Sequence, residues 1–290
     1  PETYTFLKRV DRSIYHYLNL VGAAELCKVA GDSKTSEYKK TADTLKEEIN
    51  TKMWDKSSEF YYDLHYKTDE KSLVKNIVGF YPFWADITSD DKENSLNTLF
   101  DENEFATEFP FPSVSKQCPA YSPSGGWMGN YIKGRDGCVW CGPAWPYTNG
   151  IIVDALGKQS KKYNHKYDKE FTKYLRAYAQ EHFRNNDLNC PYLVEHYNPE
   201  TGELLSDEVD YNHSYFIHLI MSHVLGIEIH NNRLIIDPID IGLDNFSCEQ
   251  ISIRGHRLDI AFDRKKGFTV TWDKKELHNS EMLTKVEIFL

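Results

Sequence analysis

The hydrophobic pattern of this chain changes its period once, near Ile227, and that change limits the folds open to it. Before that point, apolar side chains recur every three or four residues, as in residues 12–31 and 34–54, which is the spacing of amphipathic helices. After it, short runs alternate between apolar and polar residues and are separated by turn residues, which is the pattern of antiparallel strands. The sequence therefore predicts a helical region followed by a small β region.

The helical region is predicted to consist of hairpins joined by long loops. The helix over 12–31 ends at Gly31, a typical C-terminal cap, and Asp32 and Ser33 begin the helix over 34–54. Further helices are expected at 90–100, 145–157, 168–184 and 212–226. We predict a mainly α chain, with a helical domain at 1–230 and an antiparallel β module at 231–290.

Charge and hydropathy exclude several classes of partner. The chain has 44 acidic and 34 basic residues, a net charge of −10, whereas binding to a phosphate backbone needs a basic face. No run approaches the roughly 20 apolar residues of a membrane span, and no signal-peptide pattern opens the sequence. We expect no nucleic-acid partner and no membrane partner. The six cysteines are too few and too irregularly spaced to imply a disulfide framework, so the compartment, exported or cytoplasmic, stays open.

Aromatic residues make up 14% of the chain and are dense in one long loop. Between Phe109 and Pro146 the helical pattern gives way to Pro, Gly, Ser, Trp and Tyr, and long irregular loops usually carry function. Trp127, Trp140 and Trp145 lie within twenty positions of one another, a density that suits stacking on sugar rings. Packing of the loop onto the helices is the alternative role. The C-V-W-C motif of this loop lacks a second pair, so no metal site is predicted.

A second loop, residues 191–203, contains the best candidate for a catalytic carboxylate. Glu195 follows an apolar pair and precedes His196 and Tyr197. A carboxylate walled by apolar and aromatic groups would be partly desolvated and could act on water as a general base. A buried structural acid paired with an arginine is the alternative.

Taken in order, four motifs resemble the C-terminal half of the mannosylglycerate-hydrolase-like glycoside hydrolases, which are relatives of trehalase and the processing α-glucosidases. They are C-V-W-C-G-P-A-W-P at 138–146, V-E-H-Y-N-P-E-T-G-E at 194–203, Y-N-H-S-Y-F at 211–216 and R-G-H-R-L-D-I at 254–260. Each motif alone is weak, but their order is fairly specific. The resemblance implies an (α/α)6 toroid, which is a ring of six helical hairpins.

The resemblance also implies a reaction, the hydrolysis of a glycosidic bond with inversion by two carboxylates. The family's general base falls on Glu195, and the substrate is an oligosaccharide or a small glycoside. No cofactor and no metal is needed for that mechanism. The predicted substrate-binding residues, from the aromatic loops and the Y-N-H-S element, are Trp127, Trp140, Trp145, Tyr197, Tyr211, Asn212 and His213.

The family's general acid has no counterpart here, because the D-G-M-E-like segment that carries it would fall at or before Pro1. Glu2 and Asp11 are the nearest possible substitutes, with an ordinary polar role as the alternative. The helices predicted are also too few for a complete ring. We therefore expect the toroid to be incomplete here and to need an N-terminal half or a companion chain.

Two other functions stay open. A non-catalytic carbohydrate-binding relative would keep the aromatic loops without the acid. A helical-toroid lyase or epimerase would use a Tyr and His pair, either Tyr211 with His213 or Tyr197 with His196.

Overall fold

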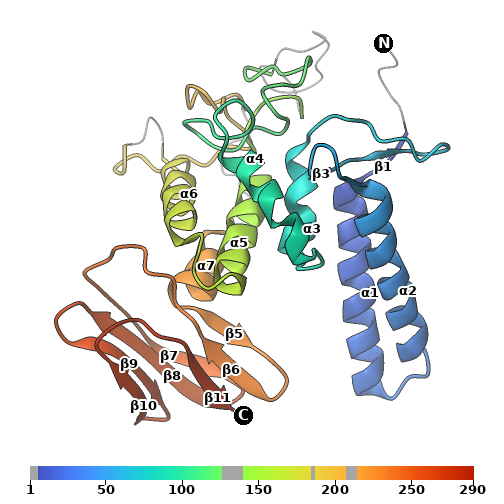
Figure 1. Cartoon of the computed structure of the whole chain (residues 1–290). Helices are drawn as coiled ribbons and strands as arrows, with labels where there is room; N and C mark the ends of the chain where they lie inside the picture. Colours follow the sequence, from blue (N-terminus) through green and yellow to red (C-terminus); the bar gives the residue numbers. More distant parts are fainter. Residues whose placement is uncertain (1–5, 126–139, 184–186, 207–213) are drawn as a thin grey trace. The chain divides into compact units, whose positions relative to one another are not determined.

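A computed structural model describes residues 6–125, 140–183, 187–206 and 214–290 (Figure 1). The chain divides into two compact units. The first comprises Pro1–Ala155 and Ala177–His213, and the second comprises Leu156–Arg176 and Ser214–Leu290. The first unit carries the loops of functional interest, whereas the second carries the strands of the C-terminal region.

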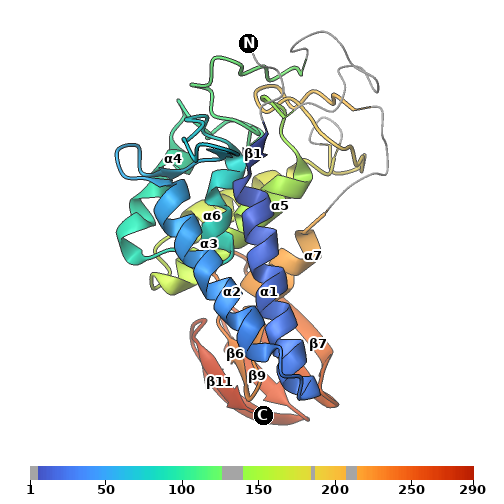
Figure 2. The same cartoon turned by 90° about the vertical axis from the view of Figure 1, so that its right-hand side faces the viewer.

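The first unit begins with a helical hairpin, as the sequence predicts. Helix α1 (Val10–Ala30) packs against helix α2 (Thr35–Glu48), which continues as a π-helical turn over Ile49–Met53 (Figure 2). Gly31 ends α1 in the left-handed conformation, with φ of 69°, and its N–H donates to the Lys28 carbonyl. A residue with a Cβ would be strained in this conformation, so the glycine fixes the end of the helix.

The rest of this unit is built from short elements around an aromatic core. Phe60, Phe80 and Phe105 are fully buried, and their ring centroids lie 5.2 to 6.3 Å apart. Strand β1 pairs with β4 and strand β2 pairs with β3. The short elements are β1 (Leu7–Lys8), β2 (Trp54–Asp55), β3 (Phe60–Tyr61), β4 (Leu64–His65), η2 (Ile77–Phe80), α3 (Tyr81–Trp84), η3 (Asp90–Ser95) and α4 (Leu96–Phe100). The helix predicted over 90–100 is thus a 3-10 turn that continues as α4.

The two predicted helices that follow the first aromatic loop are present. Helix α5 (Pro146–Lys162) starts with a proline, whose fixed φ suits the first position of a helix. Helix α6 (Asp168–Gln180) carries acidic residues in its first turn, where the helix dipole favours them. The structure also confirms helical conformation from Phe216 to Val224, as helix α7 (Phe216–Leu219) and a π-helical turn over Ile220–Val224.

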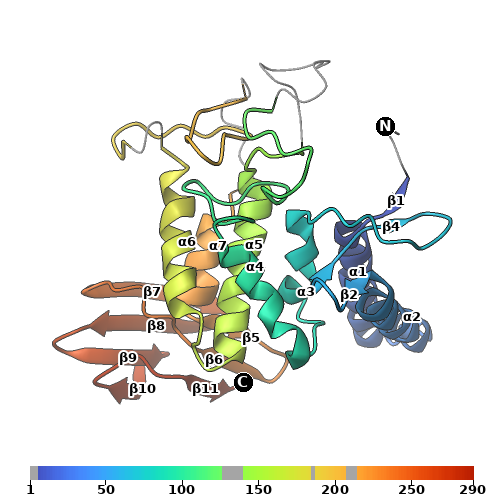
Figure 3. The same ribbon diagram turned by 45° about the horizontal axis from the view of Figure 1, so that its top comes forward.

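The C-terminal region consists of antiparallel strands, as predicted from its alternating pattern. One sheet has the order β11-β6-β5 and the other has the order β10-β9-β8-β7. Figure 3 shows the four strands of the second sheet side by side in this order. Their bounds are β5 (Ile227–Ile229), β6 (Arg233–Ile236), β7 (Asn245–Ile253), β8 (His256–Asp263), β9 (Gly267–Trp272), β10 (Lys275–Ser280) and β11 (Val286–Phe289).

Both sheets contribute to one hydrophobic core. The register that pairs Ile260 with Val270 keeps every second side chain on the buried face. Buried members of the core include Leu234, Ile236, Ile253, Leu258 and Ile260, with Ile251 packed at its margin. The predicted alternation is therefore confirmed in detail.

The described parts thus combine helices with small antiparallel sheets, and a mainly α class is supported only in part. The division into domains at 1–230 and 231–290 stays a prediction. By compactness, the strands group with Leu156–Arg176, which includes the end of α5 and most of α6. No helix in the described ranges combines the length and the apolar character needed to cross a membrane.

Candidate functional site

Three flat rings form a continuous stack in the first unit. Trp140 lies against Trp145 with ring centroids 4.1 Å apart and planes 6° from parallel. Trp145 lies in turn against His196 at 4.5 Å and 18°. Trp145 is 3% exposed, whereas Trp140 is 40% exposed. The stack therefore runs from a buried histidine to a tryptophan face that a ligand can reach.

A backbone bridge joins the two loops that carry these rings. Ala144 N–H donates to the Tyr197 carbonyl at 2.8 Å, and Tyr197 N–H donates to the Ala144 carbonyl at 3.1 Å. Because this antiparallel pair directly precedes Trp145 and directly follows His196, it sets the two rings side by side. The loops predicted to be functional thus meet, although they are far apart in the sequence.

Glu195 lies at the buried end of the stack. One of its carboxylate oxygens, Oε2, is 3.9 Å from Nδ1 of His196, and the Glu195 side chain is 15% exposed. No lysine or arginine in the described ranges pairs with Glu195. Within those ranges, the alternative of a structural acid paired with an arginine therefore has no support. A carboxylate that is shielded but still reached by solvent suits a base that must hold a water molecule.

A cleft of about 470 Å³ opens beside Trp140, a volume within the range of small-ligand sites. The first turns of α1 and α5 and the start of α3 supply its walls. The lining residues are Arg9, Asp11, Arg12, Tyr15, Val78, Tyr81, Trp140, Tyr147 and Thr148. Three short stretches that are distant in sequence therefore converge on one hollow next to the aromatic stack.

Phenol hydroxyls supply much of the polar surface of this cleft. The hydroxyls of Tyr15 and Tyr147 lie 2.5 Å apart and share a hydrogen bond. Burial raises the pKa of Tyr15 above its usual range, and the bond to Tyr147 adds to that rise. Burial also holds the pKa of Tyr81 well above its usual range. The raised pKa values of Tyr15 and Tyr81 keep these two phenols protonated near neutral pH, so both are neutral hydrogen-bond donors.

Asp11 adds a carboxylate to the same cleft. Its Oδ1 lies 3.7 Å from Arg9 Nε, its Oδ2 lies 3.9 Å from Arg12 Nε, and its side chain is 18% exposed. The buried Oδ1 makes no hydrogen bond to the described residues. A buried acceptor without a donor is unusual in a folded protein, and a bound hydroxyl would satisfy it. The cleft thus combines an aromatic face, neutral donors and a free acceptor, the groups that recognise a sugar.

The family model of the mannosylglycerate hydrolase MGH1-like glycoside hydrolase domain matches residues 4–214. The chain belongs to this family. Two curated relatives are similar over shorter stretches. An uncharacterized protein of Borreliella burgdorferi is 37% identical over 150 residues, which are 51% of this chain and 29% of that protein. The cytosolic neutral trehalase of Kluyveromyces lactis is 30% identical over 74 residues, 24% of this chain and 10% of the trehalase.

Solved structures share the fold at low sequence identity. A sialidase matches with a TM-score of 0.83 and 20% identity, over 98% of this chain and 27% of the sialidase. The GH63 mannosylglycerate hydrolase from Thermus thermophilus, in complex with Tris, matches with a TM-score of 0.50 and 18% identity, over 70% of this chain and 43% of the hydrolase. This MGH1-like chain therefore spans less than half the length of each of these relatives.

The structure brings some predicted site residues together. Trp145, Glu195 and Tyr197 meet through the backbone bridge, and Trp140 both caps the stack and lines the cleft. Tyr197 is 2% exposed and lies away from the cleft lining. The predicted residues Trp127, Tyr211, Asn212 and His213 lie outside the described ranges.

Asn149, which belongs to none of the motifs in the sequence, anchors the loop of Glu195. Its Nδ2 donates to the Pro110 carbonyl and to the Tyr197 hydroxyl, both at 2.8 Å. Its Oδ1 accepts from Phe111 N–H at 2.9 Å. One buried amide on α5 thus holds two loops. An asparagine inside an apolar helical segment was the available signal.

Glu181, just beyond α6, is a second residue missed from the sequence. It is 8% exposed, and burial raises the pKa of its carboxyl well above its usual range. The nearby Tyr197 hydroxyl and Asn149 amide offset only part of that rise. Nothing in the surrounding sequence distinguishes this glutamate from an exposed helical one.

We expect Glu181 to make stability depend on pH. Between the ordinary carboxyl pKa, about 4.3, and the raised one, the folded chain keeps a proton that the unfolded chain has released, so stability falls as pH rises. Glu181→Gln removes this pH-dependent loss of stability, because glutamine does not titrate. The difference in Tm between this variant and the wild type should grow from pH 5 to pH 8, as measured by circular dichroism. Glu200→Gln, at an exposed position, is the control, and parallel curves for Glu181→Gln would contradict the prediction.

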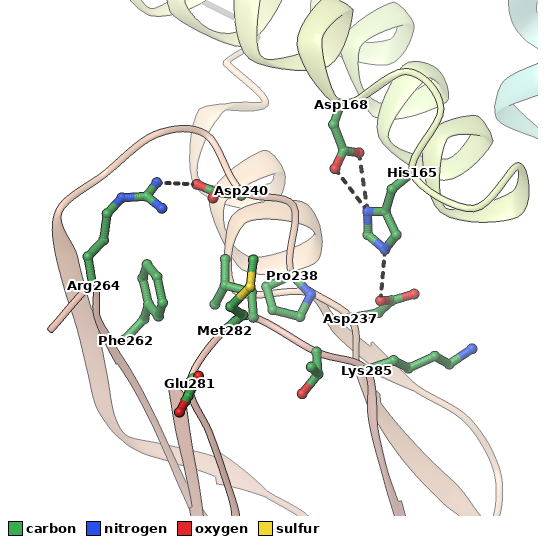
Figure 4. A pocket seen from close by; sticks show the side chains of 12 residues that line it. His165, Asp168, Asp237, Pro238, Asp240, Phe262, Arg264, Glu281, Met282 and Lys285 are labelled. Carbon is green, nitrogen blue, oxygen red and sulfur yellow. Dashed lines mark hydrogen bonds and ion pairs between the residues drawn. The ribbon is translucent and has the colours of Figure 1, made fainter. Parts of the chain in front are cut away.

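The second unit contains another hollow, of about 270 Å³, which Figure 4 shows. His165 lies between two carboxylates, with Nδ1 3.0 Å from Asp168 and Nε2 3.2 Å from Asp237. Arg264 pairs with Asp240 at 2.7 Å. The contact between His165 and Asp237 links the turn after α5 to the segment after β6. In the part of the chain that the structure describes, no cluster of histidine, cysteine and acidic residues is arranged to hold a metal ion.

Proposed function

We propose that this MGH1-like chain forms part of the catalytic domain of a glycoside hydrolase that acts on an oligosaccharide or a small glycoside. One observation carries the proposal: the accessible face of Trp140 continues through Trp145 and His196 to the carboxylate of Glu195. A surface suited to stacking on a sugar and a shielded carboxylate thus belong to one arrangement. Membership of the family supports the same reaction class.

In the proposed mechanism, Glu195 is the general base. Its carboxylate takes a proton from a water molecule as that water attacks the anomeric carbon, and a general acid on the opposite face protonates the departing oxygen. The product then has the inverted configuration. Inversion requires roughly 6.5 to 9.5 Å between the two carboxyl groups, which leaves room for the water. We place the general acid outside this chain, in an N-terminal half or a companion chain.

The substrate is proposed to lie on the aromatic stack. Trp140 provides the stacking surface, with Trp145 packed behind it, and the tyrosines of the cleft donate hydrogen bonds to hydroxyl groups. The remaining members of the proposed subsites are Trp127, Tyr211, Asn212 and His213, whereas Tyr197 positions the loop of Glu195 through its bridge to Ala144. In this proposal the helical hairpins belong to an (α/α)6 toroid, with these loops on one rim.

The stereochemistry of the product tests the proposal. The full-length protein is incubated with mannosylglycerate and with trehalose, two α-linked probes, and the anomeric protons are followed by NMR. Inversion predicts that β-mannose appears first from mannosylglycerate, and that trehalose gives equal amounts of α- and β-glucose before mutarotation. α-Mannose first, or α-glucose alone, would reject inversion. Olefinic signals would indicate a lyase, and binding of both probes without cleavage would indicate a carbohydrate-binding relative.

A further inference from the structure

A second cavity in the first unit, of about 530 Å³, shares no lining residue with the cleft beside Trp140. Its walls come from the end of α6, the loop that follows Glu195 and the segment near Phe109. The lining residues are Phe109, Glu181, Phe183, Tyr197, Thr201, Gly202, Glu203 and Leu204. Three aromatic rings and two carboxyl groups therefore face one space large enough for a small ligand.

Glu181 is the unusual member of this lining. Both of its carboxyl oxygens are buried, and neither makes a hydrogen bond of normal geometry to the described residues. The nearby Tyr197 hydroxyl and Asn149 amide offset only part of the cost of burying this carboxyl group. A ligand hydroxyl group would add a hydrogen bond of normal geometry. Since the carboxyl is held in its neutral form, because burial raises its pKa, it can donate as well as accept.

The opposite wall is a rigid turn. Gly202 N–H donates to the Asn198 carbonyl at 2.8 Å, and Asn198 N–H donates to the Glu203 carbonyl at 2.8 Å. Gly202 has a φ of 71°, and a Cβ there would lie 2.7 Å from the ring of Phe109. The turn is thus packed directly onto this aromatic ring. A preformed wall of this kind lowers the entropy cost of binding.

We propose that this cavity is a second sugar-binding site, which takes a neutral monosaccharide unit with its hydroxyl groups on Glu181 and its ring against Phe109, Phe183 and Tyr197. Aromatic faces with a few polar groups match the alternating apolar and hydroxyl surfaces of a pyranose. A neutral ligand fits because the buried carboxyl is uncharged. The site does not depend on hydrolysis at Glu195.

Methyl groups in the lining report directly on occupancy. Thr201 and Leu204 both face the cavity, so their methyl resonances are followed while methyl α-mannoside or methyl α-glucoside is added to millimolar concentration. We expect saturable shifts for at least one of the two sugars in the wild type. The same shifts should appear in Trp140→Ala, which weakens binding in the other cleft.

Two variants at Glu181 decide the role of its carboxyl. Glu181→Leu has no hydrogen-bonding group, and it should weaken the sugar affinity measured at Thr201 and Leu204 by tenfold or more. Glu181→Gln still donates and accepts, so it should stay within a few-fold of the wild type, and Glu200→Gln on the outer turn is the matched control. Unchanged affinity in a folded Glu181→Leu would overturn the proposal, as would the absence of any shift with either sugar. Because the measurement is one of binding, its failure would leave the hydrolase proposal intact.

Discussion

Replacing Glu195 by glutamine should lower kcat by on the order of a hundredfold or more, on any glycoside that the wild-type protein cleaves. Glutamine keeps the shape of the side chain but cannot accept the proton of the attacking water. Substrate affinity should survive, since the substitution leaves the tryptophan stack untouched, and in the described ranges Glu195 reaches that stack through His196, 3.9 Å away. The measurements are initial rates and substrate binding to the same purified variant.

Glu200→Gln is the matched control for this experiment. Glu200 lies on the same loop, is exposed and accepts a hydrogen bond from the Tyr121 hydroxyl at 3.0 Å, so its replacement should change kcat less than twofold. Near-normal turnover in Glu195→Gln would reject Glu195 as the base. It would also make a Tyr and His pair the stronger explanation.

Gly226→Ala should destabilise the second unit by about 3 kcal/mol, the combined effect of backbone strain and overpacking. Gly226 lies between the π-helical turn and β5 with a φ of 76°. A Cβ at this position would lie 2.2 Å from the backbone carbon of Asp237. Backbone cannot rotate away as a flexible side chain can, and the bond from Asp237 N–H to the Gly226 carbonyl, 2.9 Å, would be displaced.

Gly255→Ala separates strain from crowding. Gly255 also has a positive φ, 86°, but a Cβ there meets nothing within 4 Å. Only backbone strain should destabilise this variant, by about 1 kcal/mol in the free energy of unfolding. Urea unfolding followed by intrinsic tryptophan fluorescence, to which Trp272 contributes from the second unit, measures both variants. Equal losses of stability would show that the close approach to Asp237 contributes nothing, contrary to our expectation.

Much of the local structure followed from the sequence. Helices α1 and α2 and the strands after Ile227 were predicted from hydrophobic period alone, because a period reflects the geometry of one element and its neighbours in sequence. The cap at Gly31 was predicted for the same reason. Irregular segments were harder to predict: the short β1 to β4 ladders between Leu7 and His65 have too few residues to establish a period.

The candidate site was predictable only in part. Motif order indicated the loops of Trp140 and Glu195, and the family match over residues 4–214 supports the reaction class. Asp11 and Tyr15 were not predicted to share a cleft with Tyr147, because they come from α1 whereas Tyr147 comes from α5, and no shared motif links them. The roles assigned to Glu195 and to the tryptophans stay predictions.

What the sequence determined by itself was the kind of each regular element and the loops in which aromatic and acidic residues gather. Tertiary structure alone decided which loops meet. The bridge from Ala144 to Tyr197 joins residues 53 positions apart, and it sets Trp145 on His196. Burial likewise decides protonation: Glu181 keeps its proton because distant segments exclude water around it and so raise its pKa. Periodicity is a property of neighbouring residues, whereas dielectric environment and contact depend on every segment that packs nearby.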